Sequence, residues 1–417
     1  MSKLAILGGN PVIPEPLALY RRIGEEEVAA VVDVVRNGEL SGFVGAPVKE
    51  FDGGARVRAL EAAWRSKFGV GHAVSVNSAT SGLYAAVAAA GAGLGDEVIV
   101  PPYTMSATAL APAVCGATPV FADIEDTYFC IDPESVHRSL TSRTKAIIAV
   151  NLFGHPAQLH DLRALADEHG LILIEDNAQG PLASEDGTYA GTIGHIGVFS
   201  LNRHKHIQTG EGGICITDDE RLALRLRLIR NHGENLIEHY GDNSLSDIVG
   251  FNYRLTELSA AVGLCQLEKA DVLVAERERY AKRLSHALTG IDGFTPPACR
   301  AGCRHAYYAW PAKVNAAVLG VSRDVIARAI SAEGVPVNQG YIRPLYLLPY
   351  FQQGRAPGGR SYPKGLNPVC ERMYEQEELG FGICSFDLSE QLIDRVAEAF
   401  LKVLEGRDEL RRLEAAA

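Results

Sequence analysis

A lysine that could form a Schiff base lies in residues 199–213, which read Phe-Ser-Leu-Asn-Arg-His-Lys-His-Ile-Gln-Thr-Gly-Glu-Gly-Gly. Lys205 stands between two imidazoles, His204 and His206, after an apolar run and before a glycine-rich turn. A lysine amine becomes nucleophilic when burial or nearby cations lower its pKa, because the neutral form is then available. An ordinary loop lysine followed by turn glycines fits this segment equally well, so other segments have to decide.

Two carboxylates, Glu175 and Asp176, end an apolar run that begins at Leu171. A carboxylate at the end of a buried strand needs a partner, and the protonated pyridine nitrogen of a pyridoxal cofactor is one such partner. In that role Asp176 would keep the ring nitrogen protonated and make the ring an electron sink. Taken alone, the same carboxylate could instead cap a helix or bind a metal.

A turn of small polar residues, Asn-Ser-Ala-Thr-Ser at 77–81, leads from an apolar run into a helical pattern. The N-terminus of a helix presents free N–H groups and the positive end of the helix dipole, so it can hold a phosphate. Ser and Thr are also favoured as plain N-caps, and this segment alone does not separate the two interpretations.

The elements that must position these residues alternate between short aliphatic runs and helical patterns, which predicts an α/β fold with a mostly parallel central sheet flanked by helices. We expect strands at 73–76, 97–100, 118–121, 146–150, 171–174, 197–201 and 213–217, and helices at 80–90, 104–114, 133–140, 158–169 and 219–231. Ligands of such sheets bind beyond the carboxyl ends of the strands, where the polar residues described above would meet.

The remainder of the chain predicts a second, smaller domain. A long helical pattern covers 255–288, a mixed α+β segment punctuated by Pro and Gly follows, and an amphipathic helix closes the chain over 389–413. The 417 residues, 47% of them hydrophobic, exceed what one core usually holds. We therefore expect a large α/β domain over 1–270 and a small α+β domain over 271–417.

Composition excludes several classes of protein. The net charge of −11 and the lack of a basic run argue against a nucleic-acid binder. The uncharged stretches 69–95 and 98–122 are interrupted by polar and turn-forming residues too often to span a membrane. Eight scattered cysteines without a signal-peptide pattern predict a cytoplasmic protein with reduced thiols. Only Cys299 and Cys303, near His305, approach the spacing of zinc ligands, and we expect no metal site.

Together these segments resemble the DegT/DnrJ/EryC1/StrS family, the sugar aminotransferases of fold type I that depend on pyridoxal 5'-phosphate (PLP). The resemblance runs over nearly the whole chain, and the order and spacing of its motifs agree throughout. The motifs are Asn-Ser-Ala-Thr-Ser at 77–81, Glu-Asp-x-Ala-Gln at 175–179, Ser200 with Lys205, Thr-Gly-Glu-Gly-Gly at 209–213, Gly-Phe-Asn-Tyr-Arg at 250–254 and Glu-Leu-Ser-Ala-Ala-Val-Gly at 257–263.

The resemblance implies a role for each matching residue. Lys205 would form the internal aldimine, Asp176 would pair with the pyridine nitrogen, and Gln179 would lie near the ring and its hydroxyl. The cofactor phosphate would be held by Ala79, Thr80 and Ser200.

Two further positions bear on the cofactor. Asn252 matches the family asparagine that reaches the phosphate of the neighbouring subunit's cofactor, which implies a homodimer with shared sites. Met105 stands where the family commonly has an aromatic residue stacked on the ring. Either the thioether of Met105 packs on the ring or Tyr103 takes its place.

By this resemblance, the reaction is the transfer of an amino group from glutamate or glutamine to a keto-sugar, nucleotide-linked or free, or to a keto-cyclitol, with the pyridoxamine phosphate form (PMP) as intermediate. Such a reaction belongs to aminosugar, secondary-metabolite or surface-glycan biosynthesis. Acceptor choice would depend on the loops 230–247 and 338–349, the latter with Tyr341 and Arg343, and on the candidate contacts His232 and Tyr240.

Three other functions compete with this interpretation. A sugar dehydratase of the same family carries histidine in place of the lysine, but counting from Ser200 and back from Gly210 the family spacing falls on Lys205. A nicotinamide oxidoreductase is suggested by the glycines of 91–95, yet these follow a helix and precede a strand, which is the wrong order for a dinucleotide fingerprint. A non-catalytic regulatory protein would not require Lys205, Asp176 and Gln179 together.

Overall fold

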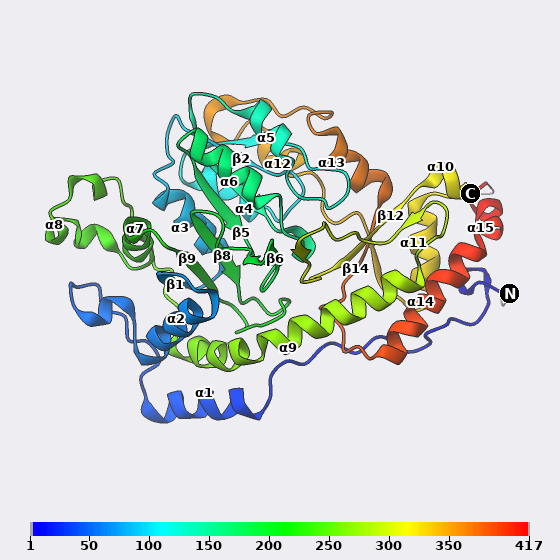
Figure 1. Ribbon diagram of the computed structural model, residues 1–417, viewed down its shortest axis with the longest axis horizontal. Helices are drawn as coiled ribbons and strands as arrows, with labels where there is room; N and C mark the ends of the chain where they lie inside the picture. Colours follow the sequence, from blue (N-terminus) through cyan, green and yellow to red (C-terminus); the bar gives the residue numbers. More distant parts are fainter. Residues whose placement is uncertain (1–2, 416–417) are drawn as a thin grey trace.

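A sheet of seven strands forms the centre of the molecule in the computed structural model, which describes residues 3–415 (Figure 1). The strand order is β1-β9-β8-β5-β4-β2-β3, and only β9 runs against the others. The strands are β1 (His72–Val76), β2 (Glu97–Val100), β3 (Thr118–Phe121), β4 (Thr144–Val150), β5 (Ile172–Asp176), β8 (Ile196–Ser200) and β9 (Gly213–Thr217). This is the expected α/β fold, and the mostly parallel sheet is confirmed.

The strands are nearly continuous apolar runs because helices cover both faces of the sheet. One face packs on α3 (Ala79–Ala89), α4 (Ala107–Val114) and α7 (Glu220–Arg230), and the other on α2 (Ala55–Phe68), α6 (Leu159–Glu168) and α9 (Glu257–Ala287). Two further helices, α1 (Glu25–Asn37) and α5 (Pro133–Ser139), pack on α9 and α6.

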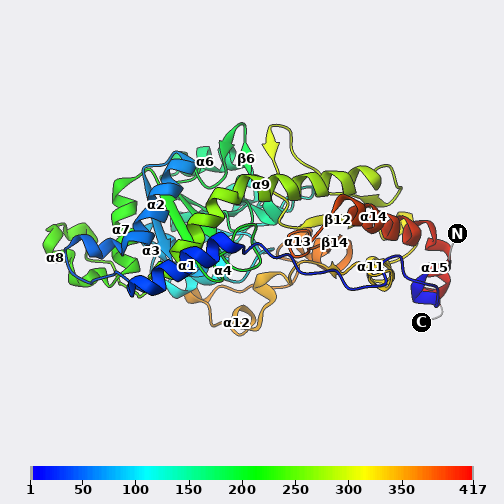
Figure 2. The same ribbon diagram turned by 90° about the horizontal axis from the view of Figure 1, so that it is seen from below.

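A second, antiparallel sheet lies beside the C-terminal half of α9, as Figure 2 shows. Its order is β10-β12-β14-β13, with bounds Phe294–Thr295, Trp310–Val314, Glu378–Phe381 and Val337–Gln339 in that order. The helices α11 (Arg323–Ala332) and α14 (Glu390–Glu405) complete an apolar cluster with it, and α15 (Arg407–Ala415) follows. The division proposed at residue 270 would fall inside α9, and it stays a prediction.

Two segments cross between these regions. Leu4 and Ile13, near the N-terminus, belong to the core of the second sheet. In the opposite direction, residues 341–373 return to the large sheet, where Leu345, Tyr346 and Phe351 join its core. The remaining elements are short: α8 (Ile237–Tyr240), α10 (Ala316–Leu319), α12 (Pro349–Gln352), α13 (Pro368–Arg372), and the strands β6 (Ser184–Glu185), β7 (Thr188–Tyr189) and β11 (Cys303–Arg304).

The structure changes several of the expected bounds. The strand expected over 171–174 runs two residues further and includes both Glu175 and Asp176. The helix expected from Thr104 begins at Ala107, and the closing helix is broken at Gly406 into α14 and α15. Within residues 3–415, we find no helix that is both long and apolar enough to cross a membrane.

Candidate active site

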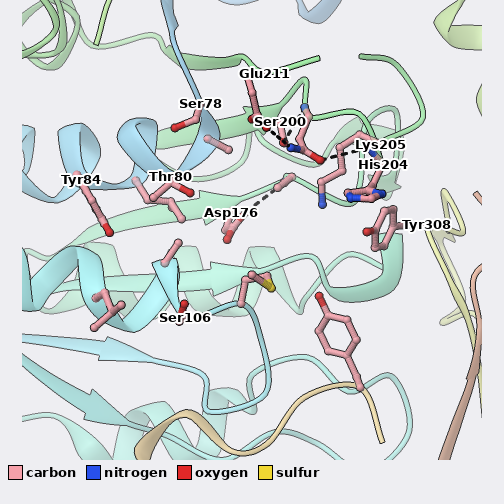
Figure 3. A pocket seen from close by; sticks show the side chains of 18 residues that line it. Ser78, Thr80, Tyr84, Ser106, Asp176, Ser200, His204, Lys205, Glu211 and Tyr308 are labelled. Atoms are coloured by element: carbon pink, nitrogen blue, oxygen red, sulfur yellow. Dashed lines mark hydrogen bonds between the residues drawn. The ribbon is translucent and has the colours of Figure 1, made fainter. Parts of the chain in front are cut away.

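A cavity of about 380 Å³ opens where the carboxyl ends of β5 and β8 face the N-terminus of α3. Figure 3 shows Thr80, Asp176 and Lys205 reaching this space from three different elements. The cavity therefore collects most of the residues that the sequence singles out. Those that line it are Ala79, Thr80, Met105, Asp176, Ser200 and Lys205.

Lys205 lies in the loop between β8 and β9, where its backbone N–H donates to the carbonyl of Asn202 at 2.9 Å. Its ammonium group lies over the ring of Tyr308, 4.3 Å from the centroid. Burial lowers the pKa of the Lys205 amine to about 8, and the nearby carboxylate of Asp176 opposes this shift. About a tenth of the amine is therefore neutral at pH 7, far more than for a solvated lysine.

Asp176 is the last residue of β5, and its carboxyl group is 5% exposed. One oxygen accepts the N–H of Ala178 at 3.1 Å, and the other accepts the hydroxyl of Thr108 at 3.2 Å. Burial raises the pKa of this carboxyl group, although both hydrogen bonds and Lys205 favour its charged form. Within the described residues it forms no ion pair, so a cationic ring nitrogen would complete its surroundings.

The N-terminus of α3 forms the opposite end of the cavity. Ser78 caps the helix by accepting the N–H of Ser81 at 3.1 Å, which leaves the N–H groups of Ala79 and Thr80 at the cavity. A Cβ added to Gly213 would lie 2.7 Å from the nitrogen of Ala79, so the glycine-rich turn must pass close to the helix end. Such an N-terminus favours a phosphate group, and the hydroxyls of Thr80 and Ser200 add donors.

The ring of Tyr308 covers the amine of Lys205. The backbone just before Tyr308 is fixed by close contacts with His206 and Gly154. His206 bonds through Nε2 to the carbonyl oxygen of Ala306 at 2.8 Å, and burial lowers the pKa of this imidazole to about 3, so it is neutral. Gly154 has φ +95°, and a Cβ there would lie 2.8 Å from the nitrogen of Tyr307. Side chains larger than hydrogen are thus excluded at Gly154.

This geometry can be compared with known proteins. The model of the DegT/DnrJ/EryC1/StrS aminotransferase family matches residues 22–398. The chain belongs to this family. It is accordingly a PLP-dependent aminotransferase, and the fold resembles the fold-type I members. The resemblance seen in the sequence is confirmed.

Several relatives cover most of the chain. L-glutamine:2-deoxy-scyllo-inosose aminotransferase of Streptomyces kanamyceticus is 32% identical over 97% of this chain and 98% of its own. The UDP-N-acetyl-3-dehydro-alpha-D-glucosamine 3-aminotransferase of Acidithiobacillus ferrooxidans is 38% identical over 68% and 73%. The structure of DesI solved in the presence of its TDP-sugar product has a TM-score of 0.83 and 30% identity over 99% of each chain.

The position that departs from the aminotransferase pattern is Met105. Its side chain is 53% exposed and lines the cavity, whereas Tyr103 is 1% exposed and does not line it. Of the two residues that the sequence left open, Met105 is thus the one placed to contact a bound ring.

Two expected cofactor residues do not line the cavity. Gln179 donates from Nε2 to the hydroxyl of Tyr341 at 3.0 Å and accepts the N–H of Phe153 at 2.7 Å, so it lies behind Tyr341, which does line the cavity. Asn252 is exposed and lies in an extended segment that pairs with Asn231. A role for Asn252 in this chain's own cavity has no support from the geometry.

The loop residues His232, Tyr240 and Arg343 do not line the cavity either. The sequence reasoning in turn missed residues that do line it, among them Tyr84, Asn202, Glu211 and Tyr308. The run His-Ala-Tyr-Tyr at 305–308 was the one available signal for Tyr308, because clustered aromatic residues outside a regular strand often mark a site.

Proposed function

We propose that this aminotransferase moves an amino group from glutamate or glutamine to a ketone on a sugar or a cyclitol. The observation that carries the proposal is the pairing, in one cavity, of a lysine amine of lowered pKa with a buried carboxylate that forms no ion pair within the described residues. That is the pair a PLP site requires, with one group for the aldehyde and the other for the ring nitrogen.

Lys205 has two tasks in this proposal. Its neutral amine would hold the aldehyde of the cofactor, and with a donor bound the same amine would take up the proton from the α-carbon of the donor. PLP supplies an electron-withdrawing ring that stabilises negative charge on that carbon. The face of Tyr308 stabilises the ammonium form of Lys205 by a cation–π contact, which holds the proton until it is returned.

The other cavity residues orient and hold the cofactor. The carboxylate of Asp176 keeps the ring nitrogen protonated and is itself fixed by Thr108 and Ala178. The N–H groups of Ala79 and Thr80 and the hydroxyl of Ser200 bind the phosphate. Met105 packs against the ring through its thioether.

Acceptor chemistry is supported by the relatives and by the cavity. One relative is named for a keto-cyclitol and another for a nucleotide-linked keto-sugar. The cavity carries polar side chains beside an apolar wall, and the polar ones include Asn202, His204, Glu211 and Tyr84. A polyhydroxylated ring can be oriented by such hydrogen-bonding groups.

We also propose that the enzyme acts as a homodimer with shared sites. Asn252 is exposed, and its neighbours Val249 and Phe251 expose 66% and 37% of their surface. Exposed apolar side chains just before a polar residue fit a contact with a second copy, in which Asn252 would reach the partner's phosphate. Light scattering should give a dimer, and Asn252→Ala should weaken PLP binding with Lys205 intact.

An absorbance spectrum tests the reaction. Purified protein with PLP should show a yellow band that shifts to the pyridoxamine phosphate spectrum when L-glutamate or L-glutamine is added. Lys205→Ala should lose the band, while His204→Ala should keep both the band and the shift because this exposed imidazole is not the attachment point.

The outcome also separates transamination from dehydration. Binding of PLP without any shift by an amino donor would argue for a dehydratase or for a non-catalytic protein. The structure offers little support for a histidine in the role of the lysine. His206 points to the carbonyl of Ala306, so Lys205 supplies the reactive nitrogen next to Asp176.

A further inference from the structure

Tyr341 occupies a wall of the cavity although its segment comes from the far end of the chain. Its hydroxyl accepts the amide N–H of Gln179 at 3.0 Å, and its ring meets that of Phe153 edge to face at 5.0 Å. Residues 340–344 form no helix or strand. Something other than regular backbone pairing must therefore fix Tyr341 at the cavity.

Tyr103 provides one fixed point. It is 1% exposed, and its hydroxyl accepts the backbone N–H of Tyr341 at 2.8 Å. The same hydroxyl donates to Oε2 of Glu378 at 3.4 Å, which leaves this second hydrogen bond long and weak. Tyr103 follows β2 in the large sheet, and Glu378 begins β14 in the second sheet. The hydroxyl thus joins the two sheets at the point where the Tyr341 segment passes between them.

Glu378 holds the same segment twice. Its carbonyl accepts the N–H of Gly340 at 3.0 Å, and its carboxyl group reaches Tyr103. The carboxyl group lies back along β14 over Gly380, where a Cβ would come within 2.7 Å of Oε1. The glycine therefore leaves room for a carboxyl group that is buried and whose Oε1 has no hydrogen-bond partner within residues 3–415.

We propose that Glu378 and Tyr103 form a positioning pair that fixes Tyr341 at the cavity and, through the hydroxyl of Tyr341, fixes the amide of Gln179. Neither Glu378 nor Tyr103 lines the cavity, so both act through Tyr341. The pair connects the second sheet to the reaction site. It also explains why a carboxyl group is buried at this position, where an apolar side chain would pack at lower cost.

Glu378 performs this role as a neutral group. Arg323 directs its N–H groups to Asp324 and to the carbonyls of Tyr374, Glu375 and Glu378, not to the carboxyl group of Glu378. Burial raises the pKa of Glu378 to about 8 in spite of this neighbouring guanidinium. A glutamine, which is neutral and keeps an oxygen for Tyr103, should therefore replace Glu378 in function.

Hydrogen exchange of the backbone tests the pair without any cofactor. The amide of Tyr341 donates to a side chain, so Tyr103→Phe should speed exchange in residues 339–345 by about tenfold or more. Glu378→Leu should do the same, and Glu378→Gln should restore the protection. Tyr362→Phe is the matched control, since it also removes a buried hydroxyl, one that donates to the carbonyl of Pro119 at 2.8 Å. Unchanged exchange in Tyr103→Phe would overturn the proposal.

The effect on the reaction rests on the proposed function and is measured separately. In the PLP-bound enzyme, Tyr103→Phe should slow the spectral shift caused by L-glutamate about tenfold at saturating donor. Tyr103→Phe combined with Glu378→Leu should be no slower than Tyr103→Phe alone, because both act through Tyr341. Additive losses would contradict the pair. A wild-type protein that shows no shift would refute the proposed function and leave the exchange result to decide the positioning role.

Discussion

Glu175 and Asp176 are neighbours in sequence, both are buried, and burial raises the pKa of both carboxyl groups. Their surroundings are nevertheless opposite. Glu175 accepts the N–H of Gly191 at 2.5 Å, the N–H of Gly194, and the amide of Asn151 at 3.3 Å. Asp176 receives one backbone N–H and one hydroxyl, and it faces a cavity.

The difference separates anchoring from chemistry. Around Glu175 two of the three donors are supplied by the loop that precedes β8, so the carboxylate fixes that loop in place. Asp176 keeps acceptor positions on its oxygens that no group of residues 3–415 fills, and these face the cavity. Burying such a carboxylate costs free energy unless a cationic ligand group binds next to it. Alternation along a strand sends the two side chains to opposite faces of the sheet, which makes this division possible.

Replacing each carboxylate by its amide should have different consequences at Glu175 and at Asp176. The larger effect is expected at Asp176, on the rate of the donor reaction. Asp176→Asn removes the negative charge that holds the ring nitrogen protonated, so the donor reaction should slow on the order of 10³-fold. The urea midpoint of unfolding of the cofactor-free protein should fall little or rise, because a buried charge is lost. Rates with L-glutamate at saturating PLP measure the effect, and a loss below tenfold would contradict the role assigned to Asp176.

Glu175→Gln should show the reverse behaviour. The amide would direct its NH₂ group toward N–H donors of the loop, so the free energy of unfolding should fall by about 2 to 3 kcal/mol. At a temperature where the variant stays folded, its rate with L-glutamate should remain within about twofold of wild type. Urea titration and the rate assay together decide the matter. A large loss of rate without a loss of stability would mean that the two carboxylates share a catalytic role.

Much of this contrast was accessible from the sequence, and some of it was not. Strands at 97–100, 118–121 and 213–217 were predicted with the observed bounds, because Gly, Pro and Asp punctuate short aliphatic runs there. The helices α1 and α2 were not predicted, although the residues of α1 carry an amphipathic pattern at helical spacing. The role of Lys205 followed from its flanking residues and family spacing.

Residues that act through tertiary contacts were beyond the sequence. Tyr308 and Tyr341 reach the cavity because distant segments dock on the large sheet, and no local pattern encodes that docking. Thr108 falls within the helix expected over 104–114, and no local pattern indicated that its hydroxyl bonds to Asp176. Glu378 ends the polar run 375–378 in the sequence, so nothing in its neighbourhood indicated a buried carboxyl group.

Glu378 is a third buried carboxyl group, and it extends the comparison. It should be neutral, whereas Glu175 and Asp176 accept hydrogen bonds from N–H or O–H donors. Its pKa is about 8 in the folded protein and near 4.5 when unfolded, so wild-type stability falls as pH rises from about 5 to 8 and then levels off. Glu378→Gln lacks this loss. Relative to wild type, the variant should gain roughly 4 kcal/mol between pH 5 and pH 9 in urea titrations.

The groups around Glu378 do not obscure this measurement. Burial raises the pKa of Tyr103, Tyr341 and Cys370, so these groups stay neutral over the window, and Arg323 is the neighbouring cation. The lysine opposite Glu378 in β12, Lys313, pairs with Asp126 instead. If the difference in stability between Glu378→Gln and wild type does not change with pH, Glu378 is ionised in the folded protein, like a carboxylate whose oxygens all accept hydrogen bonds.

The smallest effect concerns the open side of Asp176, where Met105 faces the cavity. A thioether on a ring contributes about 0.3 to 1.5 kcal/mol, so Met105→Ala should weaken PLP binding about twofold to tenfold, and Met105→Phe should match or exceed wild type. Val114→Ala, which removes a similarly exposed side chain of α4 outside the cavity, should leave binding unchanged. Because Met105 is 53% exposed, its loss should hardly alter the stability of the cofactor-free protein. Equal PLP affinity in Met105→Ala and wild type would mean that Asp176 and the N-terminus of α3 alone hold the cofactor. The side of the cavity lined by Met105 would then contribute no binding free energy.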